Sequence, residues 1–142
     1  MAFVPKDRSE VEPWLTRFYN VSDNLDVAGL STIYTEDAKV QFGNMPLMDG
    51  LDALRSFFVP TWGKLEMMHH GIGDYELVGD KIYHPCSITW KVKADPEKET
   101  IVVPAFAVFH LVTEGESKGL TSSAEFYMDS SPLMAAIQRS SS

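Results

Sequence analysis

Apolar residues in the N-terminal part of the chain recur with the 3.6-residue period of helices that bury one face. The first stripe has i, i+3, i+4, i+7 spacing and consists of Val11, Trp14, Leu15 and Phe18. Ser9 and Glu12 have the spacing of a capping box at its start. The pattern therefore predicts an amphipathic helix from about this point.

Two more helices are predicted before the pattern changes. Ser22 or Asp23 can cap the second, whose apolar stripe consists of Val27, Leu30, Ile33 and Tyr34. A short strand is expected at residues 39–42. Asp49 is available to cap the third helix, which Pro60 should end and whose apolar residues are Leu51, Leu54, Phe57 and Phe58.

After Pro60 the apolar period becomes 2, which is typical of strands. The clearest strand, residues 81–93, has one face made of Ile82, His84, Cys86, Ile88, Trp90 and Val92. A less regular strand segment is expected at 65–78, and further strands at 100–113 and 120–128. Short turns between them indicate an antiparallel meander. Ser131 followed by Pro132 predicts a last short helix through Ile137.

This order of elements predicts one α+β domain over residues 8–138. In it, a cone-shaped, strongly curved antiparallel sheet packs on three N-terminal helices around one interior pocket. A length of 142 residues suits a single domain with a core of its own. The Ser-rich residues 139–142 are expected to form a disordered tail.

Composition narrows the choice of partners. A net charge of −8 argues against nucleic acid, because phosphate binding needs clustered Lys and Arg. No apolar run approaches the roughly 20 residues that cross a bilayer, and the N-terminus lacks the apolar run of a signal peptide. Cys86 is the only cysteine, which excludes an intramolecular disulfide. We therefore expect neither a nucleic-acid nor a membrane partner, and a cytoplasmic location.

Several segments together resemble the SnoaL-like group of the nuclear transport factor 2-like superfamily, in particular its fungal members. They are TyrThrGluAspAla at 34–38, ValGlyAspLysIleTyr at 78–83, LysAlaAspProGluLysGlu at 93–99, ValProAlaPheAlaValPheHis at 103–110 and TyrMetAspSerSerProLeu at 127–133. The resemblance spans about residues 10–138. It implies a cone whose curved sheet wraps a pocket that the helices close.

The resemblance also implies a class of activity. Ketosteroid isomerase, scytalone dehydratase, limonene epoxide hydrolase, polyketide cyclases and fungal meroterpenoid isomerases are similar in using an apolar pocket with acid–base side chains and no redox cofactor. We thus expect a cofactor-independent isomerase, cyclase or dehydratase of secondary metabolism, acting on a small hydrophobic, oxygenated molecule such as a polyketide or terpenoid intermediate.

Two subgroups of this superfamily do not fit the sequence. Phe18, Phe42 and Ala107 stand where the resemblance would place the three proton-handling residues of ketosteroid isomerase. The epoxide hydrolases need an Asp-Arg-Asp arrangement across strands, and the predicted strands here carry no arginine. Neither activity is expected.

Adjacent histidines are the first candidates for catalysis. His69 and His70 lie in a predicted strand, so one faces the interior and the other faces outward. The parity of Met68 and Ile72 favours His70 as the inward residue. SnoaL-like cyclases and dehydratases often place a pocket histidine in this region, and a histidine can act as base or acid near neutral pH. A pair on the sheet surface or at a dimer interface is the alternative.

Glu125 is the second candidate, close to where the polyketide cyclases keep an acidic base. It shares parity with Ser123 and Tyr127. If that face is inward, burial raises the pKa of the carboxyl and suits it for proton transfer. The opposite face is more apolar, however, and burying that face would turn Glu125 to solvent.

The remaining candidates would bind the substrate, and they are Phe18, Tyr34, Phe42, Trp62, His84, Trp90 and Tyr127. Tyr34 is expected at the mouth of the cone, where its hydroxyl either donates to a substrate oxygen or stays in water. His84 shares the apolar face of its strand, where a histidine is more often packed than catalytic. His69 and His70 cannot both reach one ion from opposite strand faces, so no metal site is expected.

A non-catalytic module is the main alternative to an enzyme. The same cone would then bind a lipophilic ligand or another chain, and the few polar groups of the predicted interior favour this. The convex face of the sheet carries Val and Phe residues, which predicts a homodimer under either hypothesis.

Overall fold

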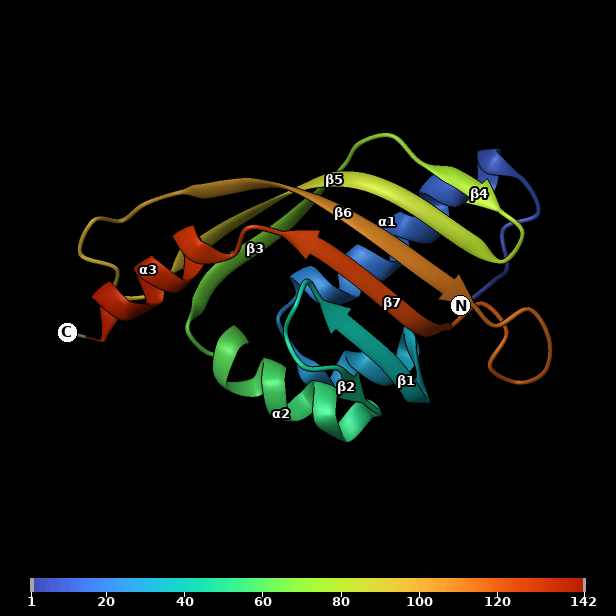
Figure 1. The fold of residues 1–142 in the computed structure, drawn as a ribbon, viewed down its shortest axis with the longest axis horizontal. Coiled ribbons are helices and arrows are strands. Elements are labelled where there is room, and N and C mark those ends of the chain that lie inside the picture. The colour runs from blue at the N-terminus through green and yellow to red at the C-terminus, as the bar shows by residue number, and fades with distance from the viewer. Residues whose placement is uncertain (1, 142) are drawn as a thin grey trace.

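The computed structural model describes residues 2–141 and forms a curved sheet with α1 and α2 on its concave side (Figure 1). The elements are η1 (Arg8–Glu10), α1 (Val11–Asp23), η2 (Val27–Thr32), β1 (Tyr34–Phe42), β2 (Met48–Asp49), α2 (Leu51–Trp62), β3 (Leu65–Ile72), β4 (Glu76–Val78), β5 (Lys81–Val92), β6 (Ile101–Leu111), β7 (Thr121–Met128) and α3 (Ser131–Ser140). The α+β cone on N-terminal helices is thus confirmed.

The sheet has the strand order β2-β1-β7-β6-β5-β3, and β4 pairs with β5 beyond the end of β3. Strands β5, β6 and β7 form the predicted antiparallel meander. One pairing differs from the expected antiparallel arrangement, because β1 and β7 run parallel. They are far apart in the chain and no tight turn joins them, so their directions are not forced to oppose.

The second N-terminal helix is shorter and later than the apolar stripe predicts. Ser22 and Asp23, the predicted caps, belong to α1, and the chain then turns at Leu25 with φ of 60°. Asp26 caps η2 instead, by accepting a hydrogen bond of 3.0 Å from the Ala28 N–H. The predicted end of this helix at Tyr34 is also wrong, since Tyr34 begins β1.

The start of α1 is stabilised differently from the prediction. Asp7 accepts a 2.9 Å hydrogen bond from the Ser9 N–H and so caps η1, which leads directly into α1. The expected capping box of Ser9 and Glu12 is therefore not formed. A short 3₁₀ turn takes its place.

Helix α2 corrects two further expectations. Gly50, with φ of 97°, precedes the helix, while Asp49 forms an ion pair of 3.2 Å with Lys39 instead of capping it. The helix also continues past Pro60 to Trp62. A proline so close to the C-terminal end removes only its own N–H from the ladder, so the last turn can still form.

The C-terminal helix α3 begins as predicted, with Pro132 in its first turn, but it continues to Ser140. The Arg139 guanidinium donates to both carboxylate oxygens of Asp95, at 3.1 and 3.0 Å, and so ties the helix to the turn between β5 and β6. Residues 139 and 140 are therefore helical, contrary to the predicted disordered tail. Ser142 lies outside the described residues.

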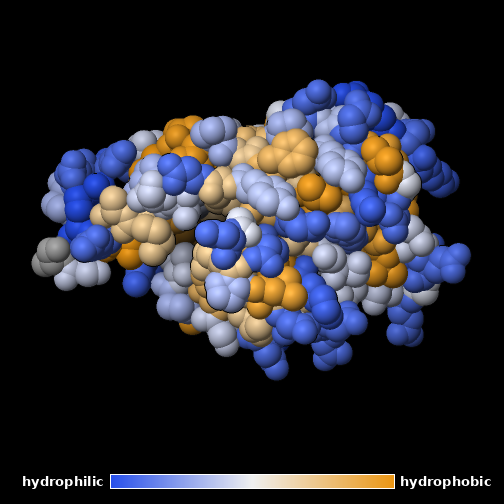
Figure 2. Space-filling view, in the orientation of Figure 1, coloured by the Kyte–Doolittle hydropathy of each residue, from blue (hydrophilic) through white to orange (hydrophobic). Residues whose placement is uncertain are grey.

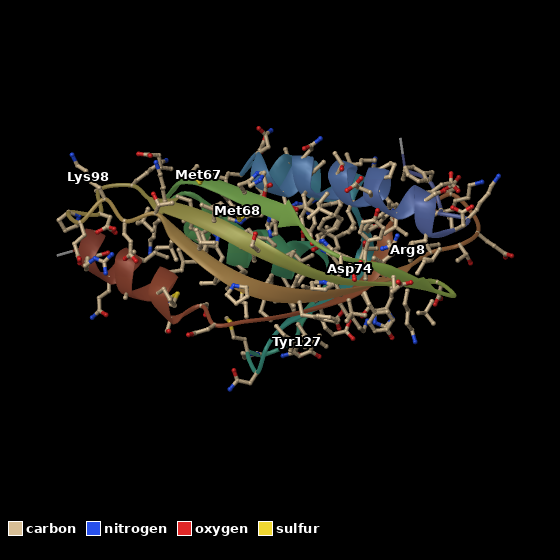
Figure 3. All side chains as sticks on the ribbon, turned by 90° about the horizontal axis from the view of Figure 1, so that it is seen from above. Arg8, Met67, Met68, Asp74, Lys98 and Tyr127 are labelled. Carbon is tan, nitrogen blue, oxygen red and sulfur yellow. The ribbon has the colours of Figure 1, made fainter. Side chains whose placement is uncertain are left out.

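The core lies between α1 and the concave face of the sheet. Its aromatic centre is formed by Trp14, Phe18, Tyr34 and Phe109, with ring centroids 4.7–5.5 Å apart in the contacting pairs. At one end of the cone, Arg8 and Asp74 pair at 3.0 Å and hold the N-terminal segment against the β3–β4 connection (Figure 3). Within residues 2–141, every helix is too short or too polar to cross a membrane.

Candidate active site

The inward face of β3 carries a histidine–carboxylate pair. His70 Nδ1 lies 2.6 Å from Asp23 Oδ1, and the His70 backbone N–H donates to Asp23 Oδ2 at 2.9 Å. The side chains are only 9% and 18% exposed, respectively. Since Asp23 binds both the backbone and the ring of one residue, it fixes the orientation of the imidazole. Nδ1 carries the shared proton, which leaves Nε2 to exchange protons with a ligand.

Tyr19 connects this pair to a second histidine. Its ring stacks on the His70 ring, with centroids 4.3 Å apart and planes inclined by 10°. Its hydroxyl lies 2.9 Å from His84 Nδ1 on β5. Tyr19 and Asp23 are four residues apart on α1, so they lie on the same face of the helix. Helix α1 therefore positions two groups of the cluster at once.

His84 is completely buried, as its strand parity predicts. Burial, with a smaller electrostatic contribution from His70, lowers the pKa of His84 to about 4, so the ring is neutral at pH 7. Its Nε2 has no hydrogen-bond partner among the described residues. Burial also raises the pKa of Tyr19 well above its usual value and that of Cys86 to about 11, so both stay protonated.

Small and half-buried side chains surround His84 on the concave face. Ala107 is its cross-strand partner on β6, and the next inward row contains Cys86, Ala105 and Met128. These three keep some exposure although they face inward. Figure 2 shows a hollow between α3 and α2, near the end of β7.

Two surface depressions lie elsewhere. One of about 590 Å³ is on the outer side of α1, and one of about 470 Å³ is at the β1–α2 edge, where Tyr34 contributes to its lining. Neither is lined by His70 or His84. The centre of the cone, where the sequence predicts an interior pocket, is packed with aromatic side chains.

The comparison with protein families decides the classification. The SnoaL-like domain matches residues 15–117 of the chain. The chain belongs to the SnoaL-like domain family. A search of curated protein sequences found no match.

Solved structures share the fold of this SnoaL-like domain. A proposed SnoaL-like polyketide cyclase from Jannaschia sp. CCS1 has a TM-score of 0.73 at 15% identity, with 94% of each chain covered. PrhC from Penicillium brasilianum has a TM-score of 0.74 at 10% identity, covering 93% of this chain and 88% of its own. SalBIII, an epoxide hydrolase/cyclase-like enzyme in pyran ring formation in the polyether salinomycin, has a TM-score of 0.71 at 16% identity. The match covers 87% of this chain and 94% of SalBIII. Together these likenesses show that the chain shares the fold of these proteins.

Most residues predicted to line the pocket of the SnoaL-like domain are core residues. Phe18 lies in the aromatic centre, Trp62 stacks on Phe58 at 4.4 Å, and Trp90 is equally buried. Tyr34 is buried too, which raises its pKa and contradicts a hydroxyl held in water at the mouth of the cone. Phe42 alone is half-buried, and it stacks between Phe57 and Phe126.

Glu125 and Tyr127 lie on the other face of the sheet. His110 Nε2 lies 3.1 Å from Glu125 Oε1 and 3.0 Å from Oε2, and only the contact with Oε1 has hydrogen-bond geometry. Tyr127 is exposed and lies on the side of the molecule opposite α1 (Figure 3). The sequence left both orientations open for Glu125, which shares its face with Tyr127. The apolar face of β7 is the buried one, so both residues point outward. His69 is also outward and 66% exposed, 3.9 Å from Asp23.

Tyr19 and Asp23 are the members of the cluster that sequence reasoning missed. The stripe of the first helix continues past Phe18 with the same spacing, and Tyr19 follows Val11 by eight positions, which is on the same face. That signal identifies Tyr19 as inward. Among the described residues, no group of three or more His, Cys, Asp or Glu side chains could hold a metal ion.

Proposed function

We propose that this SnoaL-like domain is a cofactor-independent enzyme, an isomerase, cyclase or dehydratase, that moves a proton on a small apolar oxygenated molecule. The observation that carries the proposal is the His70–Asp23 pair at 2.6 Å on the inward face of β3. His70 is the acid–base residue and Asp23 is its orienting partner.

The geometry supports this role in two ways. With Nδ1 held by Asp23, Nε2 of His70 is the nitrogen that accepts a proton from a substrate, and the nearby carboxylate stabilises the imidazolium that forms. The stacked Tyr19 ring limits rotation of the imidazole. A base held in one orientation before the substrate arrives loses little entropy in the reaction.

The surroundings favour an apolar substrate. Phe42, Phe57, Met68 and Met128 pack at the edge of the core and remain half-buried. Apolar walls with a few polar groups are typical of small-molecule sites. The ring-forming and cyclase activities in the names of similar structures support the same class of substrate.

A model carbon acid tests the chemistry. In D₂O, His70 Nε2 would take a proton from the methyl group of acetophenone, and the electron pair would move onto the carbonyl oxygen to give an enolate. A deuteron from the exchanged imidazolium would then return to carbon. NMR of the methyl signal measures this exchange, and we expect protein to accelerate it about a hundredfold or more.

Matched variants separate the inner histidine from the outer one. We expect His70→Asn to abolish the exchange and His110→Asn, which alters the pair on the convex face, to leave it unchanged. Equal exchange by wild type and a folded His70→Asn variant would refute the role of His70. Binding of acetophenone without exchange would instead support the ligand-binding module, which the filled aromatic centre favours.

We also propose that the convex face pairs two copies of the chain. Val102 and Tyr127 on this face are 61% and 52% exposed, and Phe106 between them is 39% exposed. Replacing Phe106 with Asp should give a monomer in sedimentation velocity, whereas Val59→Asp, at an exposed position of α2, should not. A monomeric wild type would contradict the pairing.

A further inference from the structure

We infer that the Nε2–H of His84 donates a hydrogen bond to an uncharged acceptor oxygen, such as a carbonyl, of a bound small molecule. Tyr19 is the positioning residue that fixes His84 in the required tautomer. The inference deepens the proposed function and rests on it for the kind of ligand. It assigns a second, non-basic role inside the same cluster.

The first step is the unpartnered nitrogen. His84 is wholly buried, and its Nε2 meets no donor or acceptor among the described residues. Buried polar atoms in folded proteins are nearly all hydrogen-bonded, because leaving one unpaired is costly. A nitrogen in this position is therefore suited to a partner from outside the chain.

The second step is the tautomer. The Tyr19 hydroxyl lies 2.9 Å from His84 Nδ1, and the Cys86 thiol is the other polar group near enough to influence its pKa. An imidazole nitrogen is a much better acceptor than a thiol sulfur. The hydroxyl therefore donates its proton to Nδ1, so the ring proton of the neutral His84 lies on Nε2. The site offers a donor, which selects an acceptor oxygen.

The third step is the small size of the side chains next to His84. The cross-strand partner of His84 is Ala107, and the next inward row begins with Cys86 and the half-buried Ala105. These are among the smallest side chains of the concave face. Tyr19 contacts both the His70 and the His84 rings, so an oxygen bound at His84 lies close to the proton-transfer group.

Two probes of the same shape test the inference. Acetophenone has a carbonyl oxygen where α-methylstyrene has a CH₂ group, so only acetophenone can accept a hydrogen bond. NMR titration of the ¹⁵N-labelled protein gives both affinities, and we expect acetophenone to bind about five- to tenfold more tightly. Long-range ¹H–¹⁵N spectra report the His84 tautomer directly, and we expect the Nε2–H form in the wild type.

Variants distinguish this role from a structural one. Tyr19→Phe should remove the tautomer preference and most of the acetophenone advantage, whereas His70→Asn should keep both although it abolishes exchange. Preferential binding of acetophenone by a wild type that catalyses no exchange would overturn the proposed function and leave the inference standing. An Nδ1–H tautomer in the wild type overturns it. Equal affinities for the two probes also overturn the inference. The absence of binding of either probe does so too, and is expected if Nε2 binds only an internal water.

Discussion

The two faces of the sheet carry histidine–carboxylate pairs of similar geometry but different surroundings. On the concave face, His70 and Asp23 are 2.6 Å apart and only 9% and 18% exposed. On the convex face, His110 and Glu125 are 3.0 Å apart and 29% and 30% exposed. The distance between histidine and carboxylate alone therefore does not show which pair could act on a substrate.

The difference lies in what each pair touches. The inner pair is stacked on Tyr19, which in turn bonds to a buried histidine with an unpartnered nitrogen. In the single chain the outer pair is about 30% exposed, so water screens its charges more than those of the inner pair, although Glu125 Oε2 itself is buried. Proton transfer is favoured by a base that is held in place, so we expect the inner pair rather than the outer one to act on a substrate. The predictions below test this contrast.

The largest expected effect is on proton exchange. Asp23→Asn keeps the shape of the orienting side chain but removes the charge that stabilises the His70 imidazolium. We expect acetophenone exchange to fall about a hundredfold. The matched change on the other face, Glu125→Gln, should leave the rate unaltered. A similar loss of exchange in both variants would mean that the inner and outer pairs do not differ in their effect on proton transfer.

The next effect is on stability in acid. The pKa of His84 is about 4 in the folded protein and near 6.5 when unfolded, so unfolding takes up a proton between these values. The contribution is fully present above pH 6.5 and is lost as the pH falls toward 4. We expect about 3 kcal/mol less stability at pH 4 than at pH 7 from this residue. Urea unfolding at both pH values measures it.

The control for this prediction is the outer histidine. His110→Gln should lose as much stability between pH 7 and pH 4 as the wild type. His84→Gln should lose much less, because no group with a strongly lowered pKa remains at that position. If the wild type is equally stable at pH 7 and pH 4, His84 is not held neutral by burial.

A smaller acid effect is expected at the far end of the cone. Hydrogen bonds from Arg139 lower the pKa of Asp95 to about 2. This stabilisation is present above the ordinary value near 3.8 and is lost as the pH falls toward 2. Arg139→Met should therefore lower the melting temperature by several degrees at pH 7 but hardly at pH 2. An equal drop at both pH values would attribute the loss to packing of α3 rather than to charge.

Sequence periodicity was sufficient for much of the fold and for half of the cluster. The strict alternation around His84, and the apolar neighbours of His70, correctly place both on the inward face. The same logic left two options for Glu125, because the pattern of one strand does not say which face the helices cover. That information comes only from the assembled sheet.

Contacts between distant segments could not be predicted in this way. Asp23 has the local signature of a helix cap, yet it binds a residue 47 positions away on β3. Arg139 similarly binds Asp95 across 44 positions and orders residues expected to be a loose tail. Local preferences favour the cap and the tail, and tertiary pairing overrides both.

The smallest expected effect is on the stability of the outer pair itself. His110 and Glu125 are part exposed, so replacing His110 with Gln should change the free energy of unfolding by less than about 1 kcal/mol, and less in high salt than in low salt. Urea unfolding at two ionic strengths measures this. A larger, salt-independent loss would mean that the proposed second copy on the convex face also covers this pair. In that case the inner and outer pairs would both be shielded from water and would differ only in the residues around them. Phe106→Asp, which should separate the two copies, would then make the stability contribution of the His110–Glu125 pair depend on salt.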